Sequence, residues 1–211
     1  MAVNRIIVIV GCGPGARECL TAEALSAIED AEVLVGSARL LSLFANLNTE
    51  RVAVRGYREE TLLAIQQHRG RRIAVLVTGD PGLASLASAV IEHFGFSFCR
   101  VLPGISSVQT AFARIGLSWE DARIISVHAV QPNLDFNALA AERKIAILTG
   151  NTESMRWIAL LAHRLGNEWR IVVAEDLTLA SERIFEVHAD QLGQLPQSLR
   201  AVILFLRKSG E

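Results

Sequence analysis

The sequence lacks the residue patterns that mark disulfide-rich proteins and metal enzymes. Its three cysteines, Cys12, Cys19 and Cys99, form no C-x-x-C pair, and an odd number cannot complete a disulfide framework. The five histidines show neither the H-E-x-x-H spacing nor a cysteine partner, so we expect no bound metal. Reduced thiols are typical of the cytoplasm, where we expect the protein to act.

Long apolar runs and an excess of one charge are also absent. The longest apolar runs, at residues 6–10 and 201–206, are far shorter than the roughly 20 residues that span a bilayer. We also expect no secretion signal, because the first run begins almost at once. Lysine and arginine number 21 against 22 acidic residues, and aromatic residues make up 6%. Since nucleic-acid binding needs basic surface and stacking platforms, we expect neither nucleic acid nor membrane as a partner.

What the sequence does contain is a large stock of core-forming residues in a regular order. Hydrophobic residues make up 51% of the 211 residues, and short apolar runs alternate with segments of helical periodicity. This order predicts strands alternating with helices in a largely parallel sheet. The stretch GLSWEDA at residues 116–122 interrupts the pattern. We therefore predict an α/β fold of two lobes, residues 1–117 and 118–211, with a ligand cleft between them.

The apolar runs also give the positions of individual elements. In the first lobe, strands are predicted at residues 6–10, 33–35, 52–54, 73–77 and 97–102. In the second, they are predicted at residues 124–127, 145–148 and 171–174, with residues 183–187 and 202–206 as a final hairpin. Helices are predicted at residues 21–28 with Thr21 as the N-cap, and at residues 59–67, 83–94, 108–115, 136–143 and 155–165.

Three predicted strands of the first lobe end in loops that contain glycine. Residues 11–15 (GCGPG) follow the first strand, residues 78–82 (TGDPG) the fourth, and residues 103–107 (PGISS) the fifth. In parallel sheets, ligands bind at the carboxyl ends of strands, where loop amides and helix N-termini converge. Glycine also lets the backbone approach a ligand closely. The three loops therefore predict one binding site.

A dinucleotide site is the first alternative for the first loop, because Gly11, Gly13 and Ala16 satisfy G-x-G-x-x-G/A. However, no acidic residue follows the second strand to bind a ribose, and Pro14 removes an amide donor from the loop. The P-loop pattern G-K-[ST] is absent. The loop suits a ligand that needs close backbone approach but little phosphate neutralisation.

The three loops, together with residues 20–25 (LTAEAL), resemble the motifs of the tetrapyrrole methylase family, which depends on S-adenosylmethionine. The resemblance implies methyl transfer to C(5) of a precorrin macrocycle in cobalamin biosynthesis, with the cofactor in the cleft between the lobes. It also implies a homodimer. Leu83-Ala84-Ser85 departs from the aromatic residues that the family commonly has there. The second, decarboxylating domain of larger relatives is absent from this chain, so we expect a separate C(15)-methyltransferase as partner.

The resemblance also implies which residues form the site. Arginine forks suit the carboxylate arms of the macrocycle, and the transfer itself requires no metal. Asp80 and His128 are both chemically able to act as a general base, and neither is assigned. The cofactor residues are expected to be Gly13, Pro14, Gly15, Thr78, Gly79, Asp80, Leu83, Ser106, Ser107, Leu148, Thr149, Glu175 and Leu177, and the substrate residues Arg39, Arg114 and Arg183.

Alternatives within and outside this family remain open. A relative of the same fold can methylate another ring position, or a different substrate such as diphthine or ribosomal RNA, although the net charge of −1 argues against RNA. A non-catalytic nucleotide-binding module is the alternative from another class. The sequence leaves open whether the macrocycle carries cobalt.

Overall fold

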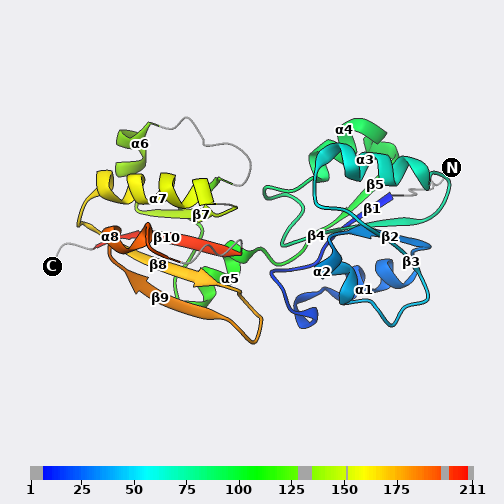
Figure 1. Cartoon of the computed structure of the whole chain (residues 1–211), viewed down its shortest axis with the longest axis horizontal. Helices are drawn as coiled ribbons and strands as arrows, with labels where there is room; N and C mark the ends of the chain where they lie inside the picture. The colour runs from blue at the N-terminus through cyan, green and yellow to red at the C-terminus, as the bar shows by residue number, and fades with distance from the viewer. Residues whose placement is uncertain (1–6, 128–134, 151, 196–199, 209–211) are drawn as a thin grey trace. The chain divides into compact units, whose positions relative to one another are not determined.

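The computed structural model describes residues 7–127, 135–150, 152–195 and 200–208. Contacts divide the chain into two compact units, Met1–Ser106 and Ser107–Glu211. The sequence had placed the boundary after Leu117. In the structure the boundary lies nearer the N-terminus, after Ser106. The reason is that helix α5 (Ser107–Arg114) contacts strand β10 (Ala201–Arg207) of the second unit (Figure 1). Within the described residues, no helix is long and apolar enough to span a membrane.

The first unit contains a five-stranded sheet in which every pairing is parallel, as predicted. Strands β1, β2 and β4 are buried along almost their whole length, because helices cover both faces. The strand order is β3-β2-β4-β1-β5, and the strands are β1 (Ile7–Gly11), β2 (Val33–Gly36), β3 (Glu50–Ala53), β4 (Ile73–Val77) and β5 (Cys99–Leu102).

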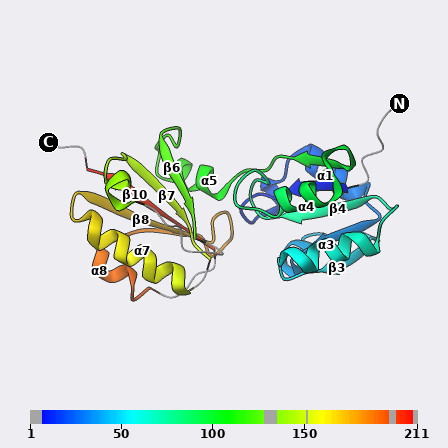
Figure 2. The ribbon, with the colours of Figure 1, turned by 90° about the horizontal axis from the view of Figure 1, so that it is seen from above.

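Two helices cover each face of this sheet (Figures 1 and 2). Helices α1 (Ala22–Glu29) and α2 (Ala38–Ser42) pack on one face, and α3 (Arg58–Gln67) and α4 (Ala87–Phe94) on the other. Thr21 is the N-cap of α1, as predicted, since its side chain accepts a hydrogen bond from the Ala24 amide at 3.1 Å.

Helix α4 begins at Ala87, so the predicted start at residue 83 is wrong. Ala84 has a positive φ of 48°, which a continuous right-handed helix does not allow. The Ser85 hydroxyl donates to the Pro81 carbonyl at 2.5 Å and accepts from the Ala87 amide at 3.0 Å. These bonds close a turn, and the loop after β4 is therefore longer than the sequence indicated.

The connections of β1 and β4 run in opposite directions across the sheet. From β1 the chain passes through α1 to β2, beyond β4, and from β4 it passes through α4 to β5, beyond β1. The two crossovers lie on opposite faces (Figure 1). A point where the strand order reverses in this way leaves the strand ends open, and ligands of parallel sheets bind there. The fold thus places the loops after β1 and β4 at such a point.

The second unit contains a mixed sheet in the order β6-β7-β10-β8-β9. Only β6 and β7 pair in parallel among these strands. Helix α7 covers one face and α5 contacts β10 on the other (Figure 1). The remaining elements are β6 (Ala122–Ser126), α6 (Phe136–Ala140), β7 (Lys144–Leu148), α7 (Thr152–Leu165), β8 (Trp169–Glu175), β9 (Arg183–Val187) and α8 (Ala189–Leu192).

The predicted final hairpin is wrong, although both of its strands exist. β9 pairs with β8, and β10 lies between β7 and β8. The reason is burial: Ala201–Leu206 is buried at every position, which suits a central strand, whereas β9 is exposed or half-buried and lies at the edge. Helix α8 was not predicted, and α6 ends three residues before the predicted Arg143.

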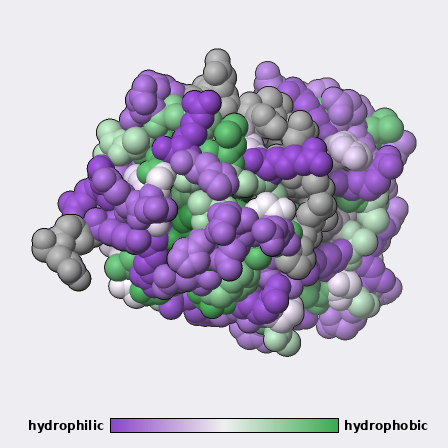
Figure 3. All heavy atoms as spheres, turned by 60° about the vertical axis from the view of Figure 1, so that its left-hand side comes forward, coloured by the Kyte–Doolittle hydropathy of each residue, from purple (hydrophilic) through white to green (hydrophobic). Residues whose placement is uncertain are grey.

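The buried hydrophobic side chains form three clusters, one on each face of the first sheet and one in the second unit. The face of the molecule in Figure 3 is mostly hydrophilic, with hydrophobic residues scattered among charged ones. In the second unit, Phe205 has no exposed surface, and its ring centroid lies 6.5 Å from that of Trp169. Large side chains in this position dominate core stability.

We therefore expect Phe205→Ala to lower the free energy of unfolding by about 3–5 kcal/mol, the usual cost of truncating a buried aromatic side chain. All three tryptophans belong to the second unit, so their fluorescence during denaturant unfolding reports on it. Leu160→Ala is the control, because Leu160 is 49% exposed. Equal unfolding midpoints for the two variants would contradict the assigned core.

Candidate active site

The loops after β1 and β4 are joined to each other beyond the end of the sheet. The Gly79 amide donates to the Gly13 carbonyl at 2.7 Å, and the Gly13 amide donates to the Gly79 carbonyl at 3.3 Å. Both residues have positive φ, at 71° for Gly13 and 70° for Gly79, which glycine adopts without strain. The two predicted loops are therefore one rigid backbone surface.

The loop after β5 lies directly against the other two. A Cβ atom on Gly104 would lie 2.4 Å from the Gly79 carbonyl oxygen, and a Cβ on Gly11 would lie 2.5 Å from the Gly104 amide nitrogen. No side chain fits between these backbones. The structure thus brings the three predicted loops together, and their contact depends on Gly11 and Gly104, which lie in the predicted loops but were not among the expected cofactor residues.

Asp80 connects two of these loops through its carboxylate. Oδ1 accepts from the Gly82 amide at 2.7 Å, and Oδ2 accepts from the Gly104 amide at 3.0 Å. The resemblance implied that Asp80 contacts the cofactor. Its carboxylate has further lone pairs that can accept hydrogen bonds from a cofactor, and the two amides fix the orientation of the carboxylate. Fastening the loop after β5 is a role that the spacing of the motif did not reveal.

Thr78 and Arg39 lie at the same edge of the sheet. Arg39, on α2, donates through Nη2 to the Thr78 hydroxyl oxygen at 3.0 Å. A hydroxyl that accepts one hydrogen bond can still donate its own hydrogen. Burial raises the pKa of the nearby Cys12 thiol to about 12. The positive charge of Arg39 and a hydrogen bond between Cys12 and the Val77 backbone act in the opposite direction and lower this pKa.

The remaining predicted residues of the first unit surround these loops. Pro14, Gly15 and Ser106 are buried, and Leu83 is half-buried. The Leu83 amide donates to the Asp80 carbonyl at 3.1 Å, so Leu83 belongs to the turn that follows β4. Ser107 is the first residue of α5 and is grouped with the second unit.

Four candidate cofactor residues of the second unit, Leu148, Thr149, Glu175 and Leu177, lie at one edge of its sheet. β7 ends at Leu148 and β8 at Glu175, and β10 begins between them at Ala201. The Thr149 hydroxyl donates to the Ala201 carbonyl at 2.9 Å, and Thr149 is 1% exposed. Leu177 is buried as well. The sequence thus identified neighbouring strand ends, and the Thr149 hydroxyl also has a structural role there.

Two of the candidate substrate arginines are paired with carboxylates of their own unit. Arg114 donates through Nε to Glu182 Oε1 at 2.8 Å and through Nη2 to Oε2 at 3.3 Å. Arg183 pairs with the buried Glu175 across β8 and β9. Arg39 donates to the Thr78 hydroxyl. His128, the other candidate base, lies outside the described residues.

An open hollow also exists at the opposite edge of the first sheet, near the amino-terminal ends of β2, β3 and β4. Its charged side chains are tied to one another: Arg71 lies 2.5 Å from Glu50, and Arg72 lies 3.3 Å from Glu32. Four carboxylates and two arginines line the hollow, so it keeps a net negative charge despite these pairs. In the residues that the structure describes, no group of side chains could hold a metal ion.

The geometry defines a class of protein: an α/β protein whose backbone loops meet at the carboxyl ends of a parallel sheet, the place where such sheets bind ligands. Residues 6–193 match the family model of tetrapyrrole (corrin/porphyrin) methylases. The chain belongs to this family.

Three known proteins show how far the similarity extends. Cobalt-precorrin-7 C(5)-methyltransferase of Salmonella typhimurium is 34% identical over 181 residues, covering 85% of this chain and 89% of that protein. The crystal structure of a precorrin-6Y methylase of cobalamin biosynthesis from Archaeoglobus fulgidus is 30% identical, with a TM-score of 0.75, covering 98% of this chain and 100% of that one. Uroporphyrin-III C-methyl transferase from Thermus thermophilus, crystallised with S-adenosyl homocysteine, shares the fold at 21% identity, with a TM-score of 0.77 and coverage of 94% and 96%.

Gly104→Ala should destabilise the first unit by more than about 2 kcal/mol, because the added Cβ meets backbone atoms that cannot move aside separately. Thermal unfolding measures the effect. Gly193→Ala is the matched control, since a Cβ there meets nothing within 4 Å and φ is not positive. If both variants melt like the wild type, the close contact of the three loops is wrong.

Cys12 should resist alkylation at pH 8. With a pKa of about 12, only about one thiol in ten thousand is ionised at that pH, and the thiolate is the nucleophile. We expect iodoacetamide to label the partly exposed Cys19 first and Cys12 last, as measured by mass spectrometry of peptides over time. Labelling of Cys12 as fast as Cys19 in folded protein would show that Cys12 is not buried beneath the loops.

Proposed function

We propose that this chain transfers a methyl group from S-adenosylmethionine to C(5) of a precorrin macrocycle in cobalamin biosynthesis. The observation that carries the proposal is the identity of 34% to a cobalt-precorrin-7 C(5)-methyltransferase, which extends over 85% of the chain. The solved precorrin-6Y methylase, at 30% identity over 98% of the chain, supports the same pathway.

The residues of the first unit suit S-adenosylmethionine rather than a nucleotide phosphate. Gly11 and Gly104 let the loop backbones pack against one another, because a Cβ on either would meet the backbone of a neighbouring loop, and the three loops carry no basic side chain to neutralise a phosphate. Thr78 and Asp80 provide a hydroxyl and a carboxylate, which pair with the ammonium and hydroxyl groups of the cofactor. The cofactor, when bound, supplies an electrophilic methyl group on a sulfonium.

The part of this chain in the reaction is positioning. The loop backbones are fixed to each other by the Gly13 and Gly79 hydrogen bonds and by Asp80, so the site does not have to be ordered when the cofactor binds. Holding donor and acceptor in line accounts for several kcal/mol of a typical barrier. Pro14 adds rigidity to the floor of the site.

The carboxylate arms of the macrocycle need cationic partners, and we propose Arg39 as the first of these. Its guanidinium donates to the Thr78 hydroxyl at the end of β4, which places a cation beside the glycine loops, where a substrate carboxylate would be met. Arg114 and Arg183 would have to exchange a protein carboxylate for one of the substrate. We leave the general base unassigned.

We further propose that the protein acts in the cytoplasm as a homodimer, and that a separate decarboxylating C(15)-methyltransferase completes the modification. The three free cysteines, two of them buried, support a reducing compartment. Size-exclusion chromatography with light scattering tests the oligomeric state, and a monomer at micromolar concentration would contradict the homodimer.

Calorimetric titration with S-adenosylhomocysteine tests the cofactor site. We expect the wild type to bind in the micromolar range or tighter, about 8 kcal/mol or more. Asp80→Ala should weaken binding at least about tenfold, because it frees the loop after β5. Asp135→Ala is a matched control: Asp135 also accepts from the amide two residues on, at 2.9 Å, but caps α6 in the second unit.

Absence of binding by folded wild-type protein would contradict the proposed function. If binding is found, incubation with S-adenosylmethionine and cobalt-precorrin-7, or its cobalt-free counterpart, tests the substrate. Mass spectrometry should show one added methyl group, and NMR should place it on C(5). Methylation at another carbon would retain the family and reject the proposed position.

A further inference from the structure

Backbone strain in the described chain gathers in two of the loops predicted to bind the cofactor. Apart from glycines, the described residues with positive φ are Ala84 (48°), Asp176 (49°) and Thr178 (70°). Ala84 follows β4, and the other two follow β8. The left-handed region is unfavourable for residues with a Cβ, and most of all for a β-branched residue such as Thr178. Strain of this kind persists only where the surroundings hold it, and it collects at functional sites.

Glu182 holds the most strained of these residues. The Thr178 amide donates to Glu182 Oε2 at 2.5 Å. Arg114, on α5, donates to both oxygens of the same carboxylate, at 2.8 and 3.3 Å. The Arg114 guanidinium and the Thr178 amide hold the pKa of Glu182 below its usual range, so the carboxylate is charged at neutral pH. The loop between β8 and β9 is thus attached to α5 through one carboxylate.

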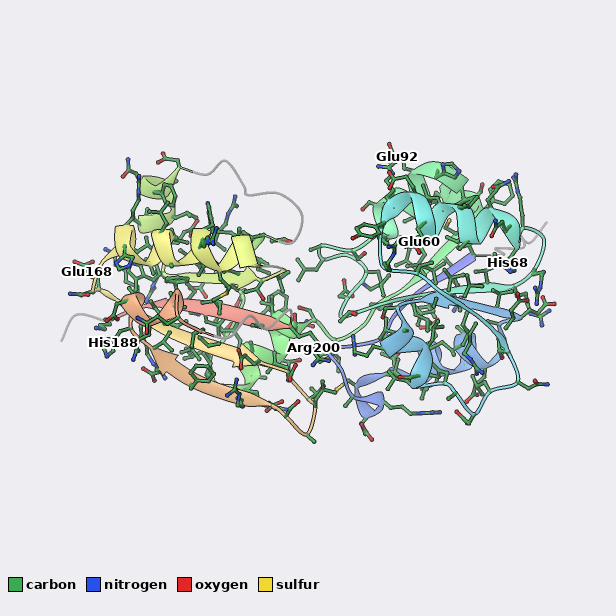
Figure 4. The ribbon with its side chains drawn as sticks, viewed as in Figure 1. Glu60, His68, Glu92, Glu168, His188 and Arg200 are labelled. Carbon is green, nitrogen blue, oxygen red and sulfur yellow. The ribbon has the colours of Figure 1, made fainter. Side chains whose placement is uncertain are left out.

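Asp176 is held from a different side. The Arg200 Nε atom lies 2.8 Å from Asp176 Oδ1, and the Ser181 hydroxyl donates to Oδ2 at 2.8 Å. The Asp176 amide donates to the Arg200 carbonyl at 3.1 Å. Figure 4 labels Arg200, which directly precedes β10. The two strained residues flank Leu177, which is only 4% exposed, so the strain fixes the position of a predicted cofactor contact.

We propose that Glu182, fixed by Arg114, is a positioning residue that holds the Thr178 backbone at positive φ and so keeps the neighbouring Leu177, a predicted cofactor contact, in place, an inference that rests on the proposed function. It changes the expected role of Arg114, whose fork braces a loop instead of holding a carboxylate of the macrocycle. Glu182 touches neither cofactor nor substrate in this account. It acts through Thr178.

A variant that relieves the strain can distinguish this role of Glu182 from a general contribution to the stability of the fold. Glycine adopts positive φ freely, so Thr178→Gly removes the reason for the loop to relax when Glu182 is changed. If Glu182 holds the loop for binding, Thr178→Gly should restore affinity in a Glu182→Gln background. If Glu182 contributes only to folding, affinity in folded protein should not respond to either change.

The experiment is titration with S-adenosylhomocysteine of the wild type, Glu182→Gln, Thr178→Gly and the double variant, with tryptophan fluorescence to confirm folding. We expect Glu182→Gln to raise the Kd about tenfold, Thr178→Gly to change it less than about twofold, and the double variant to recover most of the loss. In turnover, Glu182→Gln should raise KM for S-adenosylmethionine more than it lowers kcat. If Glu182→Gln does not fold, Arg114→Lys is the second probe, and the same rescue by Thr178→Gly is expected.

Glu186→Gln is the matched control for loss of an ion pair. Arg170 contacts Glu186 from two nitrogens, at 2.8 and 2.7 Å, across β8 and β9 of the same sheet. This control should bind like the wild type. Unchanged affinity of Glu182→Gln, an equal loss in Glu186→Gln, or no rescue by Thr178→Gly would each overturn the inference. Failure of every protein to bind, the wild type included, would instead contradict the proposed function and remove the basis of this inference.

Discussion

The contact of three backbone loops without intervening side chains is the constraint on which the candidate site depends. Gly11 and Gly104 approach so closely that a Cβ on either would overlap the other loop. Gly13 and Gly79 form an isolated antiparallel bridge beyond the parallel ends of β1 and β4. A surface of this kind can be built only where strand ends are open, and the reversal of strand order at β1 and β4 provides that place.

Each unit fixes the loops proposed to bind the cofactor by a different physical means. In the first unit, glycine removes the strain, and Asp80 joins two loops through backbone amides. In the second, non-glycine residues accept strain, and the charged side chains of Glu182 and Arg200 hold them in place. Both means fix the backbone before a ligand binds, which suits a reaction in which the protein mainly aligns donor and acceptor.

Much of the architecture could be predicted from the sequence. Parallel strands such as Ile73–Val77 are continuous apolar runs and were found at their observed bounds. The pairing of β10 could not be predicted, because an apolar run shows burial but not which neighbours bury it. The turn at Ala84 was missed since Leu83–Phe94 has helical composition, and only the backbone conformation shows the break.

The site was predictable as a set of loops but not as a set of contacts. Glycine and proline at strand ends identified residues 11–15, 78–82 and 103–107. The bonds of Asp80 to Gly104 and of Glu182 to Thr178 join segments whose relation depends on the folded backbone. Glu182 had a weak signal in the sequence, since it follows the predicted Glu175 and Leu177 closely, but nothing there distinguishes it from a surface acid.

Hydrogen exchange measured with and without S-adenosylhomocysteine tests the central claim most directly, because it reports on every backbone segment at once. The account predicts slower exchange on binding in residues 11–15, 78–86 and 103–107, and in residues 175–182. It predicts no change around Glu32, Glu50 and Arg71 at the opposite edge of the first sheet. Protection at that opposite edge, with none in the three glycine loops, would contradict the account.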